Sequence, residues 1–210
     1  MKKGIIFDMD GTLWDSAEGV AASWNQVLKE HSLDRRLFTV EDIHGVMGKT
    51  LDVIADIFFA DIDCAMRGTI MEECCAREQD YLAQHGGRLY PNVPETLRML
   101  REKYPLYIVS NCQRGYIEGF LQYYGLGDLI EDMECFGNNG RQKGENIALV
   151  AERNGLTDAV YVGDIEGDYA ASRAAGVRFI HAAYGFGIIE EPVAAVQEFR
   201  QLVQAVEEIW

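Results

Sequence analysis

The sequence predicts an α/β fold built on a parallel sheet, with an all-helical insertion near its start. Three observations lead to this prediction. Short apolar runs rich in Val, Ile, Tyr and Phe each end in a polar or glycine-containing segment, and helical patterns separate these runs. Between residues 15 and 88, by contrast, only helical patterns stand out. Because strands that alternate with helices form doubly wound sheets, we expect the 210 residues to fold as one core with a smaller insert.

The predicted strands are continuous apolar runs rather than alternating ones. This is the pattern of parallel strands that are buried on both faces of a sheet. Four runs are clear and one, residues 134–136, is weaker. The four clear runs are residues 4–7, 106–109, 159–162 and 177–180.

The helices of the core are predicted from apolar periodicity and from residues that begin or end helices. Pro94 suits a first helical turn, and Gly155 and Gly176 suit helix ends. The last helix is expected to open at Pro192, because one apolar stripe at helical spacing follows it. That stripe consists of Val193, Val196, Phe199, Val203 and Val206. The other predicted helices are residues 94–100, 115–124, 145–154 and 168–175.

The insertion begins after the first strand and ends near a pair of glycines at 86 and 87. Its helical patterns cover residues 16–30, 50–60 and 64–85. We therefore predict a helical cap at residues 15–88 and a sheet core made of residues 1–14 and 89–210.

Composition excludes several classes of partner. The chain has 19 Lys and Arg against 34 Asp and Glu, a formal net charge of −15. Nucleic-acid binding and attachment to anionic membranes both need a basic surface, so neither is expected. No run approaches the roughly 18 apolar residues of a membrane span, and the N-terminus lacks the apolar stretch of a signal peptide. With five cysteines and no CxxC pair, the sequence predicts a cytoplasmic protein with reduced thiols, and it leaves the oligomeric state open.

Polar clusters follow the predicted strands or lie in the loops between them. They are residues 8–12 (Asp-Met-Asp-Gly-Thr), Ser110 with Asn111, Lys143, and Asp164 with Asp168. Each cluster alone is compatible with a turn or a helix cap. Because the carboxyl ends of parallel strands share one edge of a sheet, we expect the four clusters to converge there, at the usual ligand site of such folds.

Convergence would crowd the carboxylates of Asp8, Asp10, Asp164 and Asp168 into a small volume. A like-charged pair at ~4 Å costs about 4 kcal/mol at an effective dielectric constant near 20, so the cluster requires a cation. Oxygen ligands without His or Cys favour a hard ion, and Mg²⁺ fits best because it also bridges to phosphate. Lys143 would add the fixed positive charge that admits a phosphate dianion.

These residue types are suited to phosphoryl transfer. Asp8 would attack the phosphorus and form an aspartyl-phosphate, and Asp10 would protonate the leaving oxygen and then activate water. Ser110 offers a hydroxyl donor to a phosphoryl oxygen. A sharp turn at Gly11 would direct backbone N–H groups toward the phosphate. We include the adjacent Thr12, together with Asn111 and Lys143, among the candidate phosphate-binding residues.

The same clusters carry a family resemblance. Residues 8–13 (DMDGTL) resemble motif I of the haloacid dehalogenase superfamily, residues 109–111 (VSN) motif II, Lys143 motif III and residues 163–168 (GDIEGD) motif IV. The resemblance implies a Rossmann-like core with a helical cap inserted after motif I. This placement of the cap is similar to that in the branch of phosphoglycolate phosphatases and β-phosphoglucomutases.

The resemblance also implies roles. Asp8 would be nucleophile and metal ligand, and Asp10 the general acid/base with its backbone carbonyl on the metal. Asp164 would bind Mg²⁺, with Asp168 supporting or completing the metal shell. Dehalogenases and phosphonatases lack an aspartate at the position of Asp10, so the resemblance disfavours both of these activities. Many relatives have proline after the motif III lysine where this chain has glycine, so Arg141 is an alternative to Lys143, which we favour.

Two residues near the predicted junction and in the cap have alternative interpretations. Lys49, in a Gly-Lys-Thr stretch, resembles the end of a phosphate-binding P-loop, but Ile43 stands where that motif needs glycine, and no strand precedes it. Lys49 is therefore a candidate to contact substrate from a cap loop, the alternative being a solvated lysine. Trp14 either packs at a hinge or forms part of the substrate wall.

The sequence thus predicts a magnesium-dependent phosphatase, an enzyme that hydrolyses a small phosphorylated metabolite such as phosphoglycolate or a sugar phosphate. Two alternatives stay open at this point: a phosphomutase that passes the phosphoryl group to a second hydroxyl, and a non-catalytic regulatory protein with the same fold. The sequence does not identify the substrate.

Overall fold

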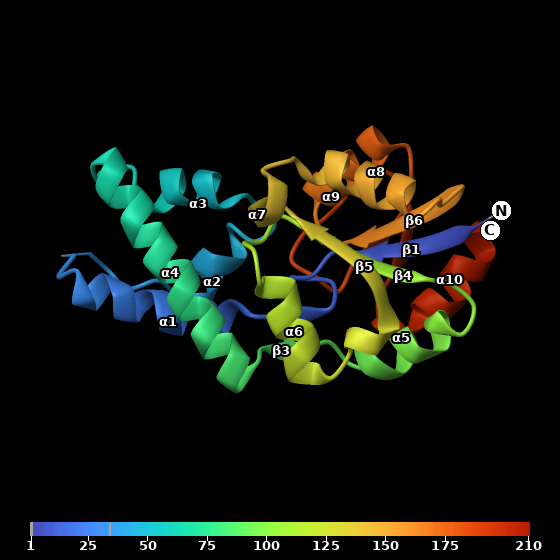
Figure 1. Ribbon diagram of the computed structural model, residues 1–210, viewed down its shortest axis with the longest axis horizontal. Coiled ribbons are helices and arrows are strands. Elements are labelled where there is room, and N and C mark those ends of the chain that lie inside the picture. The colour runs from blue at the N-terminus through green and yellow to red at the C-terminus, as the bar shows by residue number, and fades with distance from the viewer. Residues whose placement is uncertain (1, 34) are drawn as a thin grey trace.

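The computed structural model describes residues 2–33 and 35–210; residues 1 and 34, which fall in the predicted core and cap, lie outside the described residues. Its main feature is a six-stranded sheet in which all neighbouring strands are parallel (Figure 1). The strand order is β5-β4-β1-β6-β7-β8. The strands are β1 (Lys3–Phe7), β4 (Leu106–Ser110), β5 (Ile130–Cys135), β6 (Asp158–Gly163), β7 (Arg178–Ala182) and β8 (Ala194–Val196). The predicted α/β fold is confirmed.

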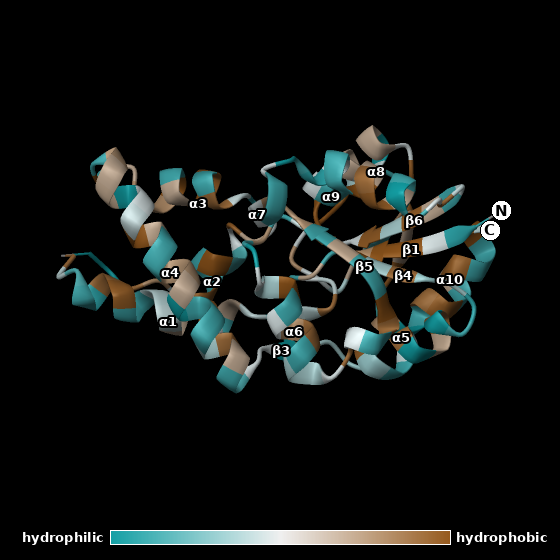
Figure 2. Cartoon of the chain, viewed as in Figure 1, coloured by the Kyte–Doolittle hydropathy of each residue, from teal (hydrophilic) through white to brown (hydrophobic). Residues whose placement is uncertain are grey.

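Helices cover both faces of this sheet. On one face, Ile6 and Tyr161 pack against apolar residues of α8, and on the other, Ile5 and Phe7 share a cluster with residues of α5 and α10. The central strands β1 and β4 are largely hydrophobic, whereas the edge strand β5 mixes hydrophilic and hydrophobic residues (Figure 2). The helical elements of the core are α5 (Val93–Arg101), α6 (Tyr116–Tyr124), α7 (Phe136–Asn139), α8 (Lys143–Arg153), α9 (Glu166–Ala175), α10 (Leu202–Ile209) and two 3-10 turns, η1 (Gly127–Leu129) and η2 (Phe199–Gln201).

The insertion is helical, as predicted, and forms a separate group beside the sheet (Figure 1). Its elements are α1 (Ala17–Glu30), α2 (Val40–His44), α3 (Leu51–Phe58) and α4 (Cys64–His85). The short helix α2 was not predicted, although Thr39 and Asp42 form a capping box at its start. None of the helices in the described residues is long and apolar enough to cross a membrane.

Two short strands join the insertion to the rest of the chain. β2 (Trp14–Asp15) pairs antiparallel with β3 (Arg88–Leu89), at the boundary positions predicted from the sequence. Trp14 is 1% exposed and packs edge-on against Tyr116, Phe120 and Tyr124 of α6. Trp14 therefore packs at the junction between the insertion and the core. This agrees with the first of its two interpretations, in which it packs at a hinge.

The prediction of one helix from Pro192 onward is wrong. Residues 194–196 instead form β8, which pairs with β7, and α10 begins only at Leu202. Val193 packs in the apolar cluster on one face of the sheet and Val196 in the cluster on the other face. Two residues on one stripe of a helix would instead pack on the same side. The unpaired edge of β7 offers backbone hydrogen bonds that this segment takes up as a strand.

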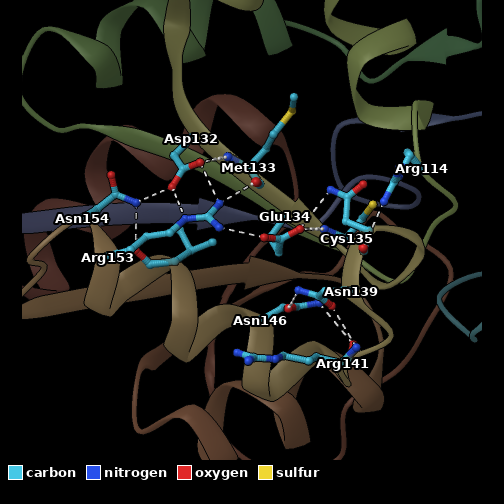
Figure 3. Close-up of polar contacts among 12 residues, drawn as sticks. Arg114, Asp132, Met133, Glu134, Cys135, Asn139, Arg141, Asn146, Arg153 and Asn154 are labelled. Atoms are coloured by element: carbon cyan, nitrogen blue, oxygen red, sulfur yellow. Dashed lines mark hydrogen bonds and ion pairs between the residues drawn. The ribbon is translucent and has the colours of Figure 1, made fainter.

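The strand β5 is longer than the predicted run because acidic residues interrupt its apolar pattern. Arg153 of α8 pairs with them: its Nε lies 2.6 Å from Asp132 Oδ2 and its Nη1 lies 2.7 Å from Glu134 Oε2 (Figure 3). Burial by itself raises the pKa of Asp132 and of Glu134, but hydrogen bonds outweigh it, so both pKa values lie below their ordinary range. The hydrogen bonds that lower the pKa most come from Arg153 and Asn154 at Asp132, and from Asn138 and Arg153 at Glu134. The network anchors α8 to the sheet edge.

We expect Arg153→Met to destabilise the protein by about 1–2 kcal/mol at pH 7, allowing for the partial exposure of the network. Because the two carboxyl pKa values are lowered in the folded state, the unfolded chain binds more protons at low pH, and the stabilisation is lost as pH falls through those values. Urea unfolding at pH 7 and pH 3 checks this, with the exposed Arg98→Met as control. If the variant lost the same free energy of unfolding at both pH values, the ion-pair explanation would be contradicted.

Candidate active site

The carboxyl ends of three adjacent strands bring the predicted residues together. Asp8 directly follows β1, Ser110 ends β4 and Asp164 directly follows β6, and these strands are neighbours in the order β4-β1-β6. All three side chains are buried, with exposed fractions of 1% for Asp8 and Asp164 and 5% for Ser110. The convergence expected from the parallel sheet is thus present in the structure.

Lys143 is the first residue of α8 and lies between two of the carboxylates. Its Nζ is 3.0 Å from Asp8 Oδ1 and 2.6 Å from Asp168 Oδ1. Burial alone would lower the pKa of Lys143, but the charges of Asp168 and Asp8 outweigh it and raise that pKa. Arg141 is exposed, and its backbone N–H donates to Asn139 Oδ1 (2.9 Å; Figure 3). The structure therefore brings Lys143, and not Arg141, to the cluster.

Asp168 organises the loop that carries Asp164. It lies in the first turn of α9, and its Oδ2 accepts hydrogen bonds from the backbone N–H groups of Asp164 (3.0 Å) and Ile165 (3.2 Å). Its other oxygen accepts from Lys143. One carboxylate thus satisfies backbone donors at a helix start and orients the buried lysine.

Asp164 is held by a segment that the sequence analysis missed. Its Oδ2 accepts a hydrogen bond from the backbone N–H of Phe186 (2.8 Å), whereas its Oδ1 is buried and has no hydrogen-bond partner among the residues that the structure describes. Gly11 approaches so closely that a Cβ there would lie 2.0 Å from Asp164 Oδ2, and its φ of +83° favours glycine. Gly11 is therefore required for the turn beside Asp164.

The same turn uses its own backbone donors. The N–H of Gly11 donates to the Trp14 carbonyl (2.9 Å) and that of Thr12 to the Met9 carbonyl (3.1 Å). These two N–H groups are therefore occupied within the turn. The Thr12 hydroxyl oxygen is buried and has no hydrogen-bond partner within residues 2–33 and 35–210, while the Thr12 carbonyl accepts from the Tyr184 hydroxyl (2.8 Å).

The carboxylates fit a hard cation. Within residues 2–33 and 35–210, Asp8, Asp164 and Asp168 each offer an oxygen within 4.8 Å of the others. Burial, followed by the charge of Asp168, raises the pKa of Asp8 to about 7. Burial, followed by the charges of Asp168 and Asp8, raises the pKa of Asp164 to about 8. Crowded carboxylates and an unpartnered Asp164 oxygen together form a donor set suited to Mg²⁺.

The carboxylate of Asp10 makes its hydrogen bonds outside the group formed by Asp8, Asp164 and Asp168. Its Oδ1 accepts hydrogen bonds from Ser16 Oγ (2.7 Å) and from the Tyr116 hydroxyl (2.8 Å), which also donates to Ser16 Oγ (2.9 Å). Burial raises the pKa of Asp10 to about 6, although these hydrogen bonds oppose the shift. Ser16 lies three residues after the last residue of motif I, and no sequence pattern points to Tyr116.

A cavity opens above these groups, between the core and the insertion. Its lining includes Asp8, Asp10 and Ser110 from the core and Lys49 from the insertion. Asn111 connects the two sides, since its Nδ2 donates to the Gly48 carbonyl (2.9 Å). Its Oδ1 is buried and has no hydrogen-bond partner in the described part of the chain. Lys49 is exposed but borders the cavity. Apart from Thr12 and the alternative cation Arg141, each side-chain candidate thus lies in the carboxylate cluster or on the cavity wall.

Comparisons with known proteins agree with this geometry. The chain is 26% identical to a phosphoglycolate phosphatase of Shigella boydii and 28% identical to one of Pectobacterium atrosepticum, in each case over 97% of this chain and 92% of the relative. Its fold is similar to that of a haloacid dehalogenase-like hydrolase from Bacteroides fragilis, with a TM-score of 0.83 and 24% identity over 96% of this chain and all of the other. A family model described as haloacid dehalogenase-like hydrolase matches residues 5–182. From this match, which covers most of the sequence and all of the motifs described above, the chain belongs to the haloacid dehalogenase-like hydrolase family.

Proposed function

We propose that this protein is a magnesium-dependent phosphatase that hydrolyses a small phosphate ester through an aspartyl-phosphate. One observation carries the proposal: Asp8, which is paired with Lys143 and grouped with Asp164 and Asp168, borders a cavity that it shares with Asp10. The names of the phosphoglycolate phosphatases with which the chain aligns along nearly its whole length favour the same reaction.

In the proposed mechanism, Asp8 attacks the phosphorus of the ester while Asp10 gives a proton to the leaving alcohol oxygen. Asp10 then takes a proton from the water that attacks the aspartyl-phosphate, which releases phosphate and restores Asp8. A pKa of about 6 suits both steps, because Asp10 can then hold and release a proton near neutral pH. Ser110 would donate a hydrogen bond to a phosphoryl oxygen.

Magnesium would be held by Asp8 and Asp164, with Asp168 in support and the backbone carbonyl of Asp10 as a further ligand. When bound, it would neutralise charge on the phosphoryl group. Lys143 would supply a second, fixed positive charge at Asp8. Phosphoryl transfer depends mainly on such positioning and charge neutralisation.

We further propose that residues 15–88 form a cap that closes over this site, with residues 1–14 and 89–210 as the catalytic core. The β2–β3 pair would form the hinge, since both chain crossings pass through it. Asn111 supports this division, because it binds the Gly48 carbonyl of the insertion from the end of β4. Closure would exclude bulk water while the ester is cleaved.

The test is hydrolysis of p-nitrophenyl phosphate by the purified protein with Mg²⁺. We expect phosphate release that EDTA abolishes and added Mg²⁺ restores. Activity that survives EDTA would refute the magnesium dependence, and no turnover with Mg²⁺ present would refute the phosphatase. With sugar phosphates, accumulation of an isomeric sugar phosphate in place of inorganic phosphate would identify a mutase instead.

Mg²⁺ is expected to stabilise the fold. At a concentration 100 times its Kd, a ligand that binds only the folded state adds about 2.7 kcal/mol, or roughly 5–10 °C in Tm for a chain of this size. Because the carboxyl pKa values of Asp8 and Asp164 are raised above that of the unfolded chain, the metal-free protein loses stability as pH rises from about 4 to 8. The Mg²⁺-induced shift should therefore be larger at pH 8 than at pH 5.5.

Thermal unfolding with and without Mg²⁺ measures this effect, and Asp164→Asn should remove most of it. The exposed Asp128→Asn is a matched control with the same change of charge. An unchanged Mg²⁺ shift in Asp164→Asn would contradict the proposed metal ligand.

Lys49 is proposed to contact the substrate at the mouth of the cavity. Lys49→Met should then raise KM about three- to tenfold with kcat nearly unchanged, because the lost contact acts on binding rather than on the reacting atoms. Steady-state kinetics with one phosphate ester checks this, with Lys29→Met on the outer end of α1 as control. Unchanged KM would return Lys49 to its alternative interpretation as a solvated lysine.

A further inference from the structure

The cap contributes a buried carboxyl group to the cavity wall. Glu78 of α4 is 4% exposed and lines the same cavity as Asp8 and Asp10. Its Oε2 accepts a hydrogen bond from Trp24 Nε1 (2.6 Å) and its Oε1 accepts one from Gln113 Nε2 (2.9 Å). Both oxygens thus face N–H donors, an arrangement that favours the ionised form.

Burial raises the pKa of Glu78 to about 7, and the two hydrogen bonds oppose that shift. Each carboxylate oxygen has two lone pairs, so each can accept one further hydrogen bond. Glu78 can therefore receive a donor from a molecule in the cavity without losing its present partners.

The rest of the cap wall offers little to an anion. Most of its side chains are apolar, among them Val20, Ile43, Val46, Met47, Leu51 and Ile54. Lys49 is the one cationic side chain among the described residues that line the cavity, and it is exposed to solvent. Lys143 is committed to Asp8 and Asp168 at the phosphoryl end. A negatively charged group deep in the cavity would meet Glu78 and Asp10 without a buried cation to pair with.

This arrangement bears on the alcohol part of the substrate, and the inference rests on the proposed function. If the phosphoryl group occupies the Asp8 end, the alcohol part extends toward the cap and Glu78. We propose that Glu78 is a specificity-determining residue that accepts a hydrogen bond from a hydroxyl or ammonium group of the alcohol part and rejects esters that carry a carboxylate there. The substrate class is then the phosphate esters of neutral polyols and amino alcohols, and phosphoglycolate is a poor substrate.

Three esters with two-carbon alcohol parts test this, because they differ mainly in charge: 2-phosphoglycolate, 2-hydroxyethyl phosphate and O-phosphoethanolamine. For each, kcat/KM is measured, together with the inhibition constant against p-nitrophenyl phosphate hydrolysis. For the unmodified protein we expect phosphoglycolate to be at least about tenfold worse than the other two, as desolvated like charges predict. Equal or better use of phosphoglycolate would overturn the proposal, as would the absence of inhibition by all three esters.

Glu78→Gln removes the charge and keeps the size of the side chain. We expect kcat/KM for phosphoglycolate, relative to 2-hydroxyethyl phosphate, to rise about tenfold, and that for O-phosphoethanolamine to fall. Glu72→Gln, an exposed change of the same type on the same helix, should leave the ranking unchanged. If Glu78→Gln alters all three esters by one common factor, Glu78 has only a structural role and the proposal is overturned.

Failure of the Glu78 proposal and failure of the proposed function give different results. The ranking in the unmodified protein needs no variant, so it decides the proposal even if Glu78→Gln does not fold. The proposed function fails by a different result, the absence of p-nitrophenyl phosphate hydrolysis in the presence of Mg²⁺.

Discussion

Asp8→Asn is expected to lose about a thousandfold or more in kcat for phosphate-ester hydrolysis, the largest effect of any single substitution considered. The amide keeps the size of the side chain but has no anionic oxygen to attack phosphorus, so no aspartyl-phosphate forms. The fold should persist, because Lys143 retains its 2.6 Å contact with Asp168. The variant also removes a carboxyl group whose ionisation is opposed by burial.

The measurement is steady-state hydrolysis of p-nitrophenyl phosphate, with circular dichroism and thermal unfolding to verify the fold. Asp128→Asn, an exposed substitution of the same kind, should retain full activity. A folded Asp8→Asn protein with more than a tenth of the original kcat would show that another group is the nucleophile.

Lys143→Met is expected to reduce both activity and stability. Removing one partner of a buried ion pair costs about 3–5 kcal/mol, because the remaining charge is left without compensation. Lys143 is the cation within reach of Asp8 and Asp168 at this position, and its side chain is only 5% exposed. Loss of the charge that offsets the phosphoryl group should lower kcat about 100- to 1,000-fold.

The stability loss should depend on pH. Without Lys143 the pKa of Asp8 rises further above that of an unfolded aspartate, so the folded state binds more protons than the unfolded state between about pH 4 and 8. Stability then falls as pH rises, and the deficit of the variant should be larger at pH 8 than at pH 5.5. Urea unfolding at the two pH values measures it.

Arg141→Met is the matched control, because it removes a cation two residues away that is exposed. It should change neither stability nor kcat appreciably. If Arg141→Met lost activity while Lys143→Met retained it, the assignment of Lys143 to motif III would be wrong.

Local sequence patterns predicted those strands whose residues are all buried in the same kind of surroundings. Continuous apolar runs located β1, β4, β6 and β7, since a strand buried on both faces has apolar residues throughout. They failed at the sheet edges. In β5 the acidic residues are paired with Arg153 from another element, and in β8 the edge of β7 decided the conformation.

The sequence by itself determined that Asp8, Ser110 and Asp164 would meet, because strand ends in a parallel sheet share one edge. Lys143 begins α8, and it was expected beside them from charge balance and from the family resemblance. Only the tertiary structure decided which neighbours hold them: Tyr116 on Asp10, the Phe186 N–H on Asp164, and Glu78 on the cap wall. The physical reason is separation along the chain. Tyr116 and Asp10 are 106 residues apart, and a hydrogen bond between them depends on how two elements pack rather than on any periodicity within either. Similarly, Arg141 and Lys143 are alike in charge, and the direction in which α8 begins determines which of them is buried against Asp8.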